Sequence, residues 1–152
     1  IDCQHRRVEE ALKAGGAAVG AKTVIETLPG MFPLACSPRL NDLFVENIKE
    51  YFPETKIEDA GHFTASTDMG DISHLMPSIH PFIGGVDGGL HTKDFCVTDF
   101  DAAAILPGKV FAMNIIDLLY DEAAMAKEIL EKEKPILTKE EYLAKLESYF
   151  QS

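Results

Sequence analysis

The chain contains 152 residues, of which 46% are hydrophobic, so its length indicates one globular domain that is able to bury a core. Its formal net charge is -11, from 25 acidic and 14 basic residues, and this excess disfavours nucleic acids and anionic membranes as partners. The three cysteines form no CxxC pair, which excludes a zinc ribbon and a dithiol redox motif, and free thiols fit the reducing cytoplasm.

The first two predicted elements are a helix and a strand. Residues 6–20 carry an apolar face of small residues, which predicts a helix, and Gly20 suits its C-cap. The β-branched segment TVIETL at residues 23–28 predicts a strand. Residues 29–38 are irregular and bounded by prolines, and they form the predicted boundary between this helix–strand unit and the rest of the chain.

The middle of the chain predicts one helix and two short strands. Residues 41–52 place apolar side chains near one helical face, with Asn41 as the expected N-cap and Pro53 after the end. Residues 56–58 predict a short strand, and a buried strand is predicted around residues 80–83.

The C-terminal part of the chain is predicted to be helical. Residues 100–120 contain the longest predicted helix, residues 122–132 continue as a second helical segment, and a last helix begins at Thr138. Thr138 and Glu141 form a capping box, in which each side chain bonds the other residue's free backbone N–H. Helices interspersed with strands predict an α/β fold.

The residues that carry chemistry concentrate between positions 61 and 95. This segment reads GHFTASTDMGDISHLMPSIHPFIGGVDGGLHTKDF, and its glycines and prolines divide it into short pieces, so that loops deliver the side chains. Imidazoles and carboxylates on loops between apolar runs are typical of metal and acid–base sites. The segment holds His62, His74, His80 and His91, together with Asp68, Asp71, Asp87 and Asp94.

His91 is the strongest candidate for a metal ligand. It follows two glycines and a leucine, and from such a turn its Nε2 atom could reach a metal, with a surface loop histidine as the alternative. Ser66, Thr67 and Asp68 suit a tight loop that holds a carboxylate. That carboxylate could orient a ligand histidine or bind a substrate amine or amide, and the alternative is a self-satisfied turn.

The other histidines are weaker candidates. His74 is predicted to be packed and hydrogen-bonded, His80 is predicted to lie in the core, and His62 fits either role. No HExxH, GxSxG or phosphate-binding loop occurs, and the glycine pairs at 84–85 and 88–89 predict turns only. Zinc hydrolysis needs three protein ligands per metal. One strong candidate therefore predicts either that the other ligands lie outside this chain or that the protein is not a metalloenzyme.

The string GHFTASTDMGDISHLMPSIHPFIGG, followed by HTKDF, resembles a known signature. It is similar to the C-terminal catalytic part of the aminoacylase/carboxypeptidase G superfamily of metallopeptidases (peptidase family M twenty), and most similar to the amidohydrolase branch that includes aminobenzoyl-glutamate hydrolases. Residues 6–34 resemble the last helix and strand of that family's lid or dimerisation domain. Residues 41–52 and 112–119 resemble helices of its catalytic domain.

The resemblance implies a fold and an activity. Residues 35–136 would be the C-terminal part of a three-layer αβα zinc-peptidase-like catalytic domain, after the end of a lid domain at residues 1–34 and before an extra C-terminal helix at residues 137–152. The implied reaction is hydrolysis of amide bonds in N-acyl amino acids or small peptides, with a divalent metal, zinc, as cofactor. By position, His91 would be a metal ligand, and Ser66, Thr67 and Asp68 would bind the substrate.

The family's other ligands and its base glutamate would lie upstream of this chain. We therefore expect a C-terminal fragment of a cytoplasmic enzyme, inactive alone, and the first residue, Ile1, fits a piece of something longer. The alternative is a non-catalytic binding or assembly domain, because the chain is long enough to fold and lacks a full ligand set. No apolar run reaches the roughly 18 residues of a membrane span, so no membrane partner is expected. A homo-oligomer is expected, because part of an α/β domain would expose sheet edges and apolar faces.

Overall fold

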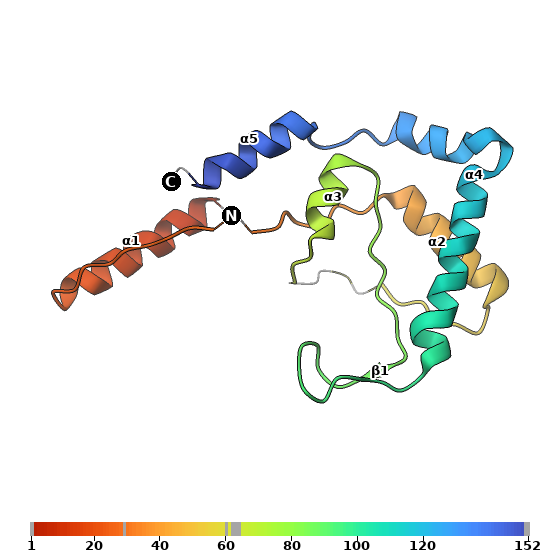
Figure 1. Ribbon diagram of the computed structural model, residues 1–152, viewed down its shortest axis with the longest axis horizontal. Coiled ribbons are helices and arrows are strands. Elements are labelled where there is room, and N and C mark those ends of the chain that lie inside the picture. The colour runs from red at the N-terminus through yellow and green to blue at the C-terminus, as the bar shows by residue number, and fades with distance from the viewer. Residues whose placement is uncertain (1, 29, 60, 62–64, 151–152) are drawn as a thin grey trace. The chain divides into compact units, whose positions relative to one another are not determined.

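The computed structural model describes residues 2–28, 30–59, 61 and 65–150, and Figure 1 shows their arrangement in elements. By their contacts, the residues divide into two compact units, residues 1–30 with 143–152 and residues 31–142. The assignment of residues 1–34 to a lid domain stays a prediction. In chain order the elements are α1 (Asp2–Ala18), α2 (Pro38–Tyr51), α3 (Met69–Leu75), β1 (Val86–Asp87), β2 (Cys96–Val97), the π-helical turn η1 (Asp101–Ile105), α4 (Leu106–Lys132) and α5 (Lys139–Phe150).

The first unit contains α1 and the segment that returns along it. The predicted helix is confirmed, and Gly20 ends it in the left-handed region with φ 72°. The predicted strand at residues 23–28 is wrong, because the segment has no regular structure. Its threonines bond α1 instead: Thr23 Oγ1 donates to the Leu12 carbonyl at 3.4 Å, and Thr27 Oγ1 donates to Glu9 Oε1 at 3.5 Å. A strand needs a neighbouring strand for its backbone groups, and α1 cannot supply one.

The core of the second unit lies between α2 and α4, which run side by side in Figure 1. Phe44 and Ile48 of α2 and the fully buried Val110 of α4 form its centre. Around this centre, partly buried apolar side chains close the cluster: Phe52, Ile79, Leu106 and Met113. The apolar spacing of residues 41–52 therefore correctly predicted which face of α2 packs.

The N-termini of α2 and α5 can be compared with the capping residues predicted from the sequence. Helix α2 begins at Pro38, and its N-cap is Ser37, whose Oγ accepts a hydrogen bond from the Leu40 N–H at 3.1 Å. The predicted N-cap, Asn41, is wrong because proline suits the first helical turn and the helix starts before it. At α5 the capping box is confirmed: the Thr138 N–H donates to Glu141 Oε2 at 2.8 Å, and the Glu141 N–H donates to Thr138 Oγ1 at 3.2 Å.

The long helical region of residues 101–132 confirms the two helical segments predicted there. It opens with the π-helical turn η1 and leaves helical geometry at residues 120–123, where the φ angles of Asp121, Glu122 and Ala123 are 50°, 53° and 61°. By length and hydropathy alone the stretch Asp101–Lys132 is apolar enough to cross a membrane, although Lys109 and Asp117 interrupt its apolar sequence. The absence of a membrane partner stays a prediction.

Paired strands are few in the part of the chain that the structure describes. The predicted strands at residues 56–58 and 80–83 are wrong, because both segments are irregular. The two-residue strands β1 and β2 pair antiparallel, with Val86 opposite Val97 and Asp87 opposite Cys96. The three-layer αβα fold stays a prediction.

The chain leaves much of its apolar surface exposed. On α4, Ile115, Ile116 and Leu119 are 56%, 63% and 64% exposed. Apolar side chains of this kind usually form the buried face of a helix, but here no described part of the chain covers them.

Candidate functional site

His91 lies in the loop of the β1–β2 hairpin, at residues 88–95. The Thr92 Oγ1 and the Thr92 N–H both donate to the Gly89 carbonyl, at 2.8 and 3.2 Å, and fold the loop on itself. His91 is exposed, and its φ of 61° is in the left-handed region that residues other than glycine seldom adopt. Among the described residues, none hydrogen-bonds to its ring. The hairpin therefore presents an unengaged imidazole at its surface.

Two glycines of the motif are required by the hairpin backbone, which agrees with their prediction as turn residues. Gly85 has a φ of 86°, and a Cβ atom there would lie 2.6 Å from the Asp99 carbonyl oxygen. Gly88 has a φ of 85°, and a Cβ atom there would overlap the carbonyl oxygen of Asp94. The Gly85 carbonyl accepts from the N–H groups of Thr98 and Asp99 at 3.0 and 3.1 Å. These contacts fix the base of the hairpin that carries His91.

Ser66, Thr67 and Asp68 lead into α3 and form a turn bonded mainly within itself. Thr67 Oγ1 donates to Asp68 Oδ1 at 3.2 Å and accepts from the Met69 N–H at 3.4 Å. Asp68 is at the N-cap position of α3, but its side chain makes no capping hydrogen bond. Ser66 and Asp68 are exposed and Thr67 is half-buried. These bonds agree with the alternative interpretation, a turn whose polar groups bond one another. The Asp68 carboxylate is nevertheless exposed to solvent.

The two predicted parts of the site are not joined by a hydrogen bond among the described residues. Neither His91 nor Asp68 bonds the other segment. The described residues also contain no group of three or more His, Cys, Asp or Glu side chains placed to hold a metal ion. On this observation the described residues do not fit a complete metal site, and the role of His91 as a metal ligand stays a prediction.

The other histidines have different surroundings. His74 Nδ1 lies 2.9 Å from the Gly70 carbonyl and its ring packs against Phe32 with centroids 5.1 Å apart, which confirms the prediction of a packed, hydrogen-bonded histidine. His80 is half-buried beside Phe82, so the prediction of a core histidine needs correction. Its Nδ1 atom is buried and has no hydrogen-bond partner among the residues that the structure describes. His62 lies outside the described residues.

Two polar residues of the motif have a role that the sequence did not reveal. Asp71 Oδ1 accepts from the Phe32 N–H at 2.9 Å, and Ser73 Oγ accepts from the Ala35 N–H at 3.0 Å while it donates to the Gly70 carbonyl. Both residues thereby hold residues 32–35 against α3. The partners are 38 and 39 residues away in sequence, so only the polar character of one helical turn could have hinted at this function.

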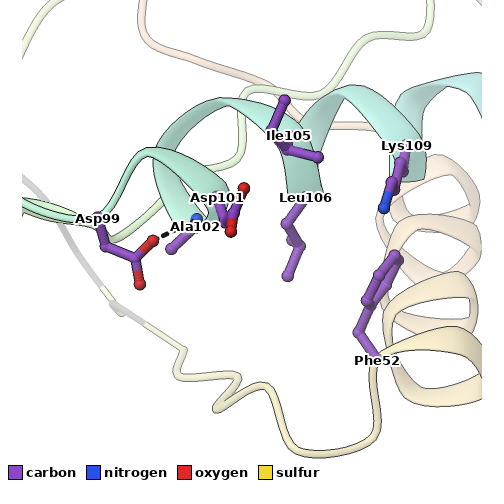
Figure 2. A pocket seen from close by; sticks show the side chains of 7 residues that line it. All are labelled: Phe52, Asp99, Asp101, Ala102, Ile105, Leu106 and Lys109. Atoms are coloured by element: carbon purple, nitrogen blue, oxygen red, sulfur yellow. Dashed lines mark hydrogen bonds between the residues drawn. The ribbon is translucent and has the colours of Figure 1, made fainter.

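A hollow of about 400 Å³ opens at the start of the long helical region (Figure 2). Asp99 Oδ1 accepts from the Ala102 N–H at 3.0 Å there, so one of its acidic residues already caps the helix. Figure 2 also shows Lys109 beside Phe52 on the other side of the hollow. The lining residues are Phe52, Asp99, Asp101, Ala102, Ile105, Leu106 and Lys109. The hollow lacks the candidate residues of the motif.

Comparison with known proteins finds a distant relative. The mouse protein named Xaa-Arg dipeptidase is 29% identical to this chain over 128 residues, which cover 79% of the chain. The matched residues make up 30% of the length of that dipeptidase, so the chain spans less than a third of its relative. No protein-family profile matches the chain. No solved structure matches it either. The chain is therefore a distant relative of a dipeptidase.

Proposed function

We propose that this chain is the C-terminal portion of a metal-dependent amidohydrolase or peptidase that hydrolyses amide bonds of N-acyl amino acids or small peptides. The observation that carries the proposal is the similarity to a dipeptidase along 79% of the chain. The similarity includes no more than 30% of that relative, so catalysis would require protein beyond these 152 residues. We further propose that the enzyme is cytoplasmic and homo-oligomeric.

In this proposal, His91 supplies one donor to a divalent metal, zinc. Its exposed position in a folded hairpin loop supports this role, because a ligand contributed to a shared site must project from its own segment. A bound zinc ion would supply Lewis acidity toward an amide carbonyl. The remaining donors and the general base would come from outside the described residues, since these contain no ligand group of three.

The Ser66, Thr67 and Asp68 turn would contact the substrate. The exposed Asp68 carboxylate has acceptor capacity beyond its bond from Thr67, and the Ser66 hydroxyl is exposed beside it. A carboxylate of this kind can accept from a substrate ammonium or amide N–H. Asp68→Asn in the full-length protein should therefore lower kcat/KM by roughly tenfold, as expected for one charge-assisted hydrogen bond. Unchanged kinetics would leave the turn with a structural role only.

The uncovered apolar surface also supports a chain that packs against more protein. Phe111 of α4 is in ring contact with Phe44 of α2 and yet 41% exposed, and the neighbouring Ile115 is more exposed still. Contiguous exposed apolar residues on a helix mark a face that another protein surface covers. A non-catalytic assembly domain would expose such a face as well, so activity decides between the two functions.

The direct test uses the full-length protein that contains this chain. Its hydrolysis of dipeptides with C-terminal arginine and of N-acyl amino acids is measured before and after treatment with a zinc chelator, and again after zinc is restored. We expect hydrolysis that chelation abolishes and zinc restores. The 152-residue chain alone should neither hydrolyse these compounds nor retain stoichiometric zinc. A zinc-loaded full-length protein without activity on either class would refute the proposal and favour the assembly domain.

A further inference from the structure

The backbone turns a corner inside α4, at residues 120–123. Figure 1 shows two straight helical pieces that meet there at a large angle. At the corner, Asp121, Glu122 and Ala123 have φ angles of 50°, 53° and 61°, and their ψ angles of 57°, 33° and 37° complete a left-handed turn. Side chains with a Cβ atom are sterically strained in this region, and here three consecutive residues adopt it. The corner thus stores strain that an ordinary helix connection would avoid.

The local sequence favours a straight helix through the corner. Residues 122–132 read EAAMAKEILEK, and all of these residues except isoleucine are strong helix formers. Residues 119–124 contain neither glycine nor proline, which would normally end a helix or suit the left-handed region. The bend is therefore imposed by contacts further along the chain, and not by the residues that form it.

Those contacts are made by residues 124–142, which we call the arm. Near α2, the Arg39 N–H donates to Glu133 Oε1 at 3.2 Å, and Arg39 Nη2 lies 3.8 Å from Met125 Sδ. Near α3, the Leu137 N–H donates to the His74 carbonyl at 3.0 Å. Ile129 in the middle of the arm is only 5% exposed. The arm is thus a docked element, bonded to the body of the unit at several points.

The end of the arm is docked as well. The ring of Tyr142 meets Phe32 edge-on, with centroids 5.7 Å apart. Burial, and next the nearby carboxylate of Asp71, raise the pKa of the Tyr142 hydroxyl above its ordinary value of 10.0. The arm therefore has specific partners on the body along its whole length, and a second copy of the chain would present the same partners.

We propose that two copies of this chain exchange their arms: the corner at residues 121–123 opens into continuous α-helix, and each arm docks on the body of the other copy. The contacts of Glu133, Leu137 and Tyr142 with the body are then formed again across the two chains. Residues 143–150 continue helix α5 and move with the arm. The exchange relieves six left-handed residues, three in each chain, and this relief has to outweigh the translational and rotational freedom that two chains lose when they associate. Strained hinges of this kind favour domain swapping.

The test combines a hinge variant with a matched control. Glu122→Gly places in the corner a residue that adopts the left-handed region without strain and disfavours continuous helix, so it should stabilise the closed monomer. Glu131→Gly makes the same chemical change at an exposed helical position of the arm, away from the corner. By sedimentation equilibrium, Glu122→Gly should raise the dimer dissociation constant at least about tenfold over Glu131→Gly. Ala123→Gly should raise the dimer dissociation constant as well, so that the test does not depend on the folding of one hinge variant.

A covalent trap then identifies the arms in the dimer. In a chain whose native cysteines are replaced by serine, Arg39→Cys and Met125→Cys place thiols on the body and on the arm, and a short bis-maleimide joins them. We expect the dimer fraction to give cross-links between chains and the monomer fraction to give cross-links within one chain. A dimer with cross-links only within chains, or a wild-type chain that stays monomeric at all concentrations, would overturn the proposal.

Discussion

The buried polar contact between α2 and α4 gives the most quantitative prediction. Asn47 is 5% exposed, and its Nδ2 donates to Asn114 Oδ1 and to Asp117 Oδ2, both at 2.8 Å. Asn47→Ala removes both bonds and leaves the buried Asn114 oxygen without its donor. A lost bond to a carboxylate together with an unsatisfied buried acceptor should lower the free energy of unfolding by about 3 kcal/mol.

The assay is urea unfolding followed by circular dichroism. With a slope of about 2 kcal/mol per M, the loss should move the midpoint down by about 1.5 M. Asn41→Ala is the matched control, because it makes the same change at an exposed position of the same helix and carries the same gain in helix propensity. Its free energy of unfolding should stay within about 0.5 kcal/mol of wild type, which is a midpoint shift of about 0.25 M at that slope. Equal midpoints for the two variants would refute the packing of α2 on α4 described above.

Three further predictions concern caps and turns. Ser37→Ala should lower the free energy of unfolding by about 1 kcal/mol, whereas Asn41→Ala should leave it nearly unchanged. A lower urea midpoint for Asn41→Ala than for Ser37→Ala would show that Asn41, and not Ser37, is the N-cap. The backbone N–H of Thr138 and then its hydroxyl hold the pKa of Glu141 below its ordinary 4.5. The capping box therefore stabilises α5 above pH 4.5 and loses this effect as pH falls through the folded-state pKa. In wild type, the protection of the α5 amides from hydrogen exchange should fall as the pH falls. If Glu141→Gln shows the same fall in protection, the Glu141 carboxylate does not stabilise the helix in this way. Gly88→Ala should abolish the exchange protection of the β1–β2 pair, and unchanged protection would show that its φ of 85° is dispensable.

The helices were predictable because their signals are local. The apolar spacing of residues 41–52 and the capping box at Thr138 act within one or two turns, so the sequence contains the whole interaction. The strands predicted at residues 23–28, 56–58 and 80–83 failed because a strand depends on partners elsewhere. Their β-branched and apolar residues are suited to a sheet, and the described part of the chain supplies no neighbouring strand for them.

The candidate site was predictable only in its pieces. The tight turn at Thr67 and the glycine-dependent loop before His91 follow from local conformational preferences, and both are present. Which distant segments meet is set by long-range packing, as the bonds of Asp71 and Ser73 to residues 32–35 show. The sequence predicted two helical segments that meet near residue 121, but not the left-handed backbone of residues 121–123, because the flanking residues are helix formers.

The proposed coordination of a catalytic metal by His91 is tested most directly by metal stoichiometry. Zinc per chain is measured in the full-length protein for wild type, His91→Ala and His5→Ala, the last being the same change at an exposed histidine of α1. We predict that His91→Ala loses about one metal equivalent and nearly all amide hydrolysis, whereas His5→Ala keeps both. Full zinc content and full activity in His91→Ala would contradict the assignment.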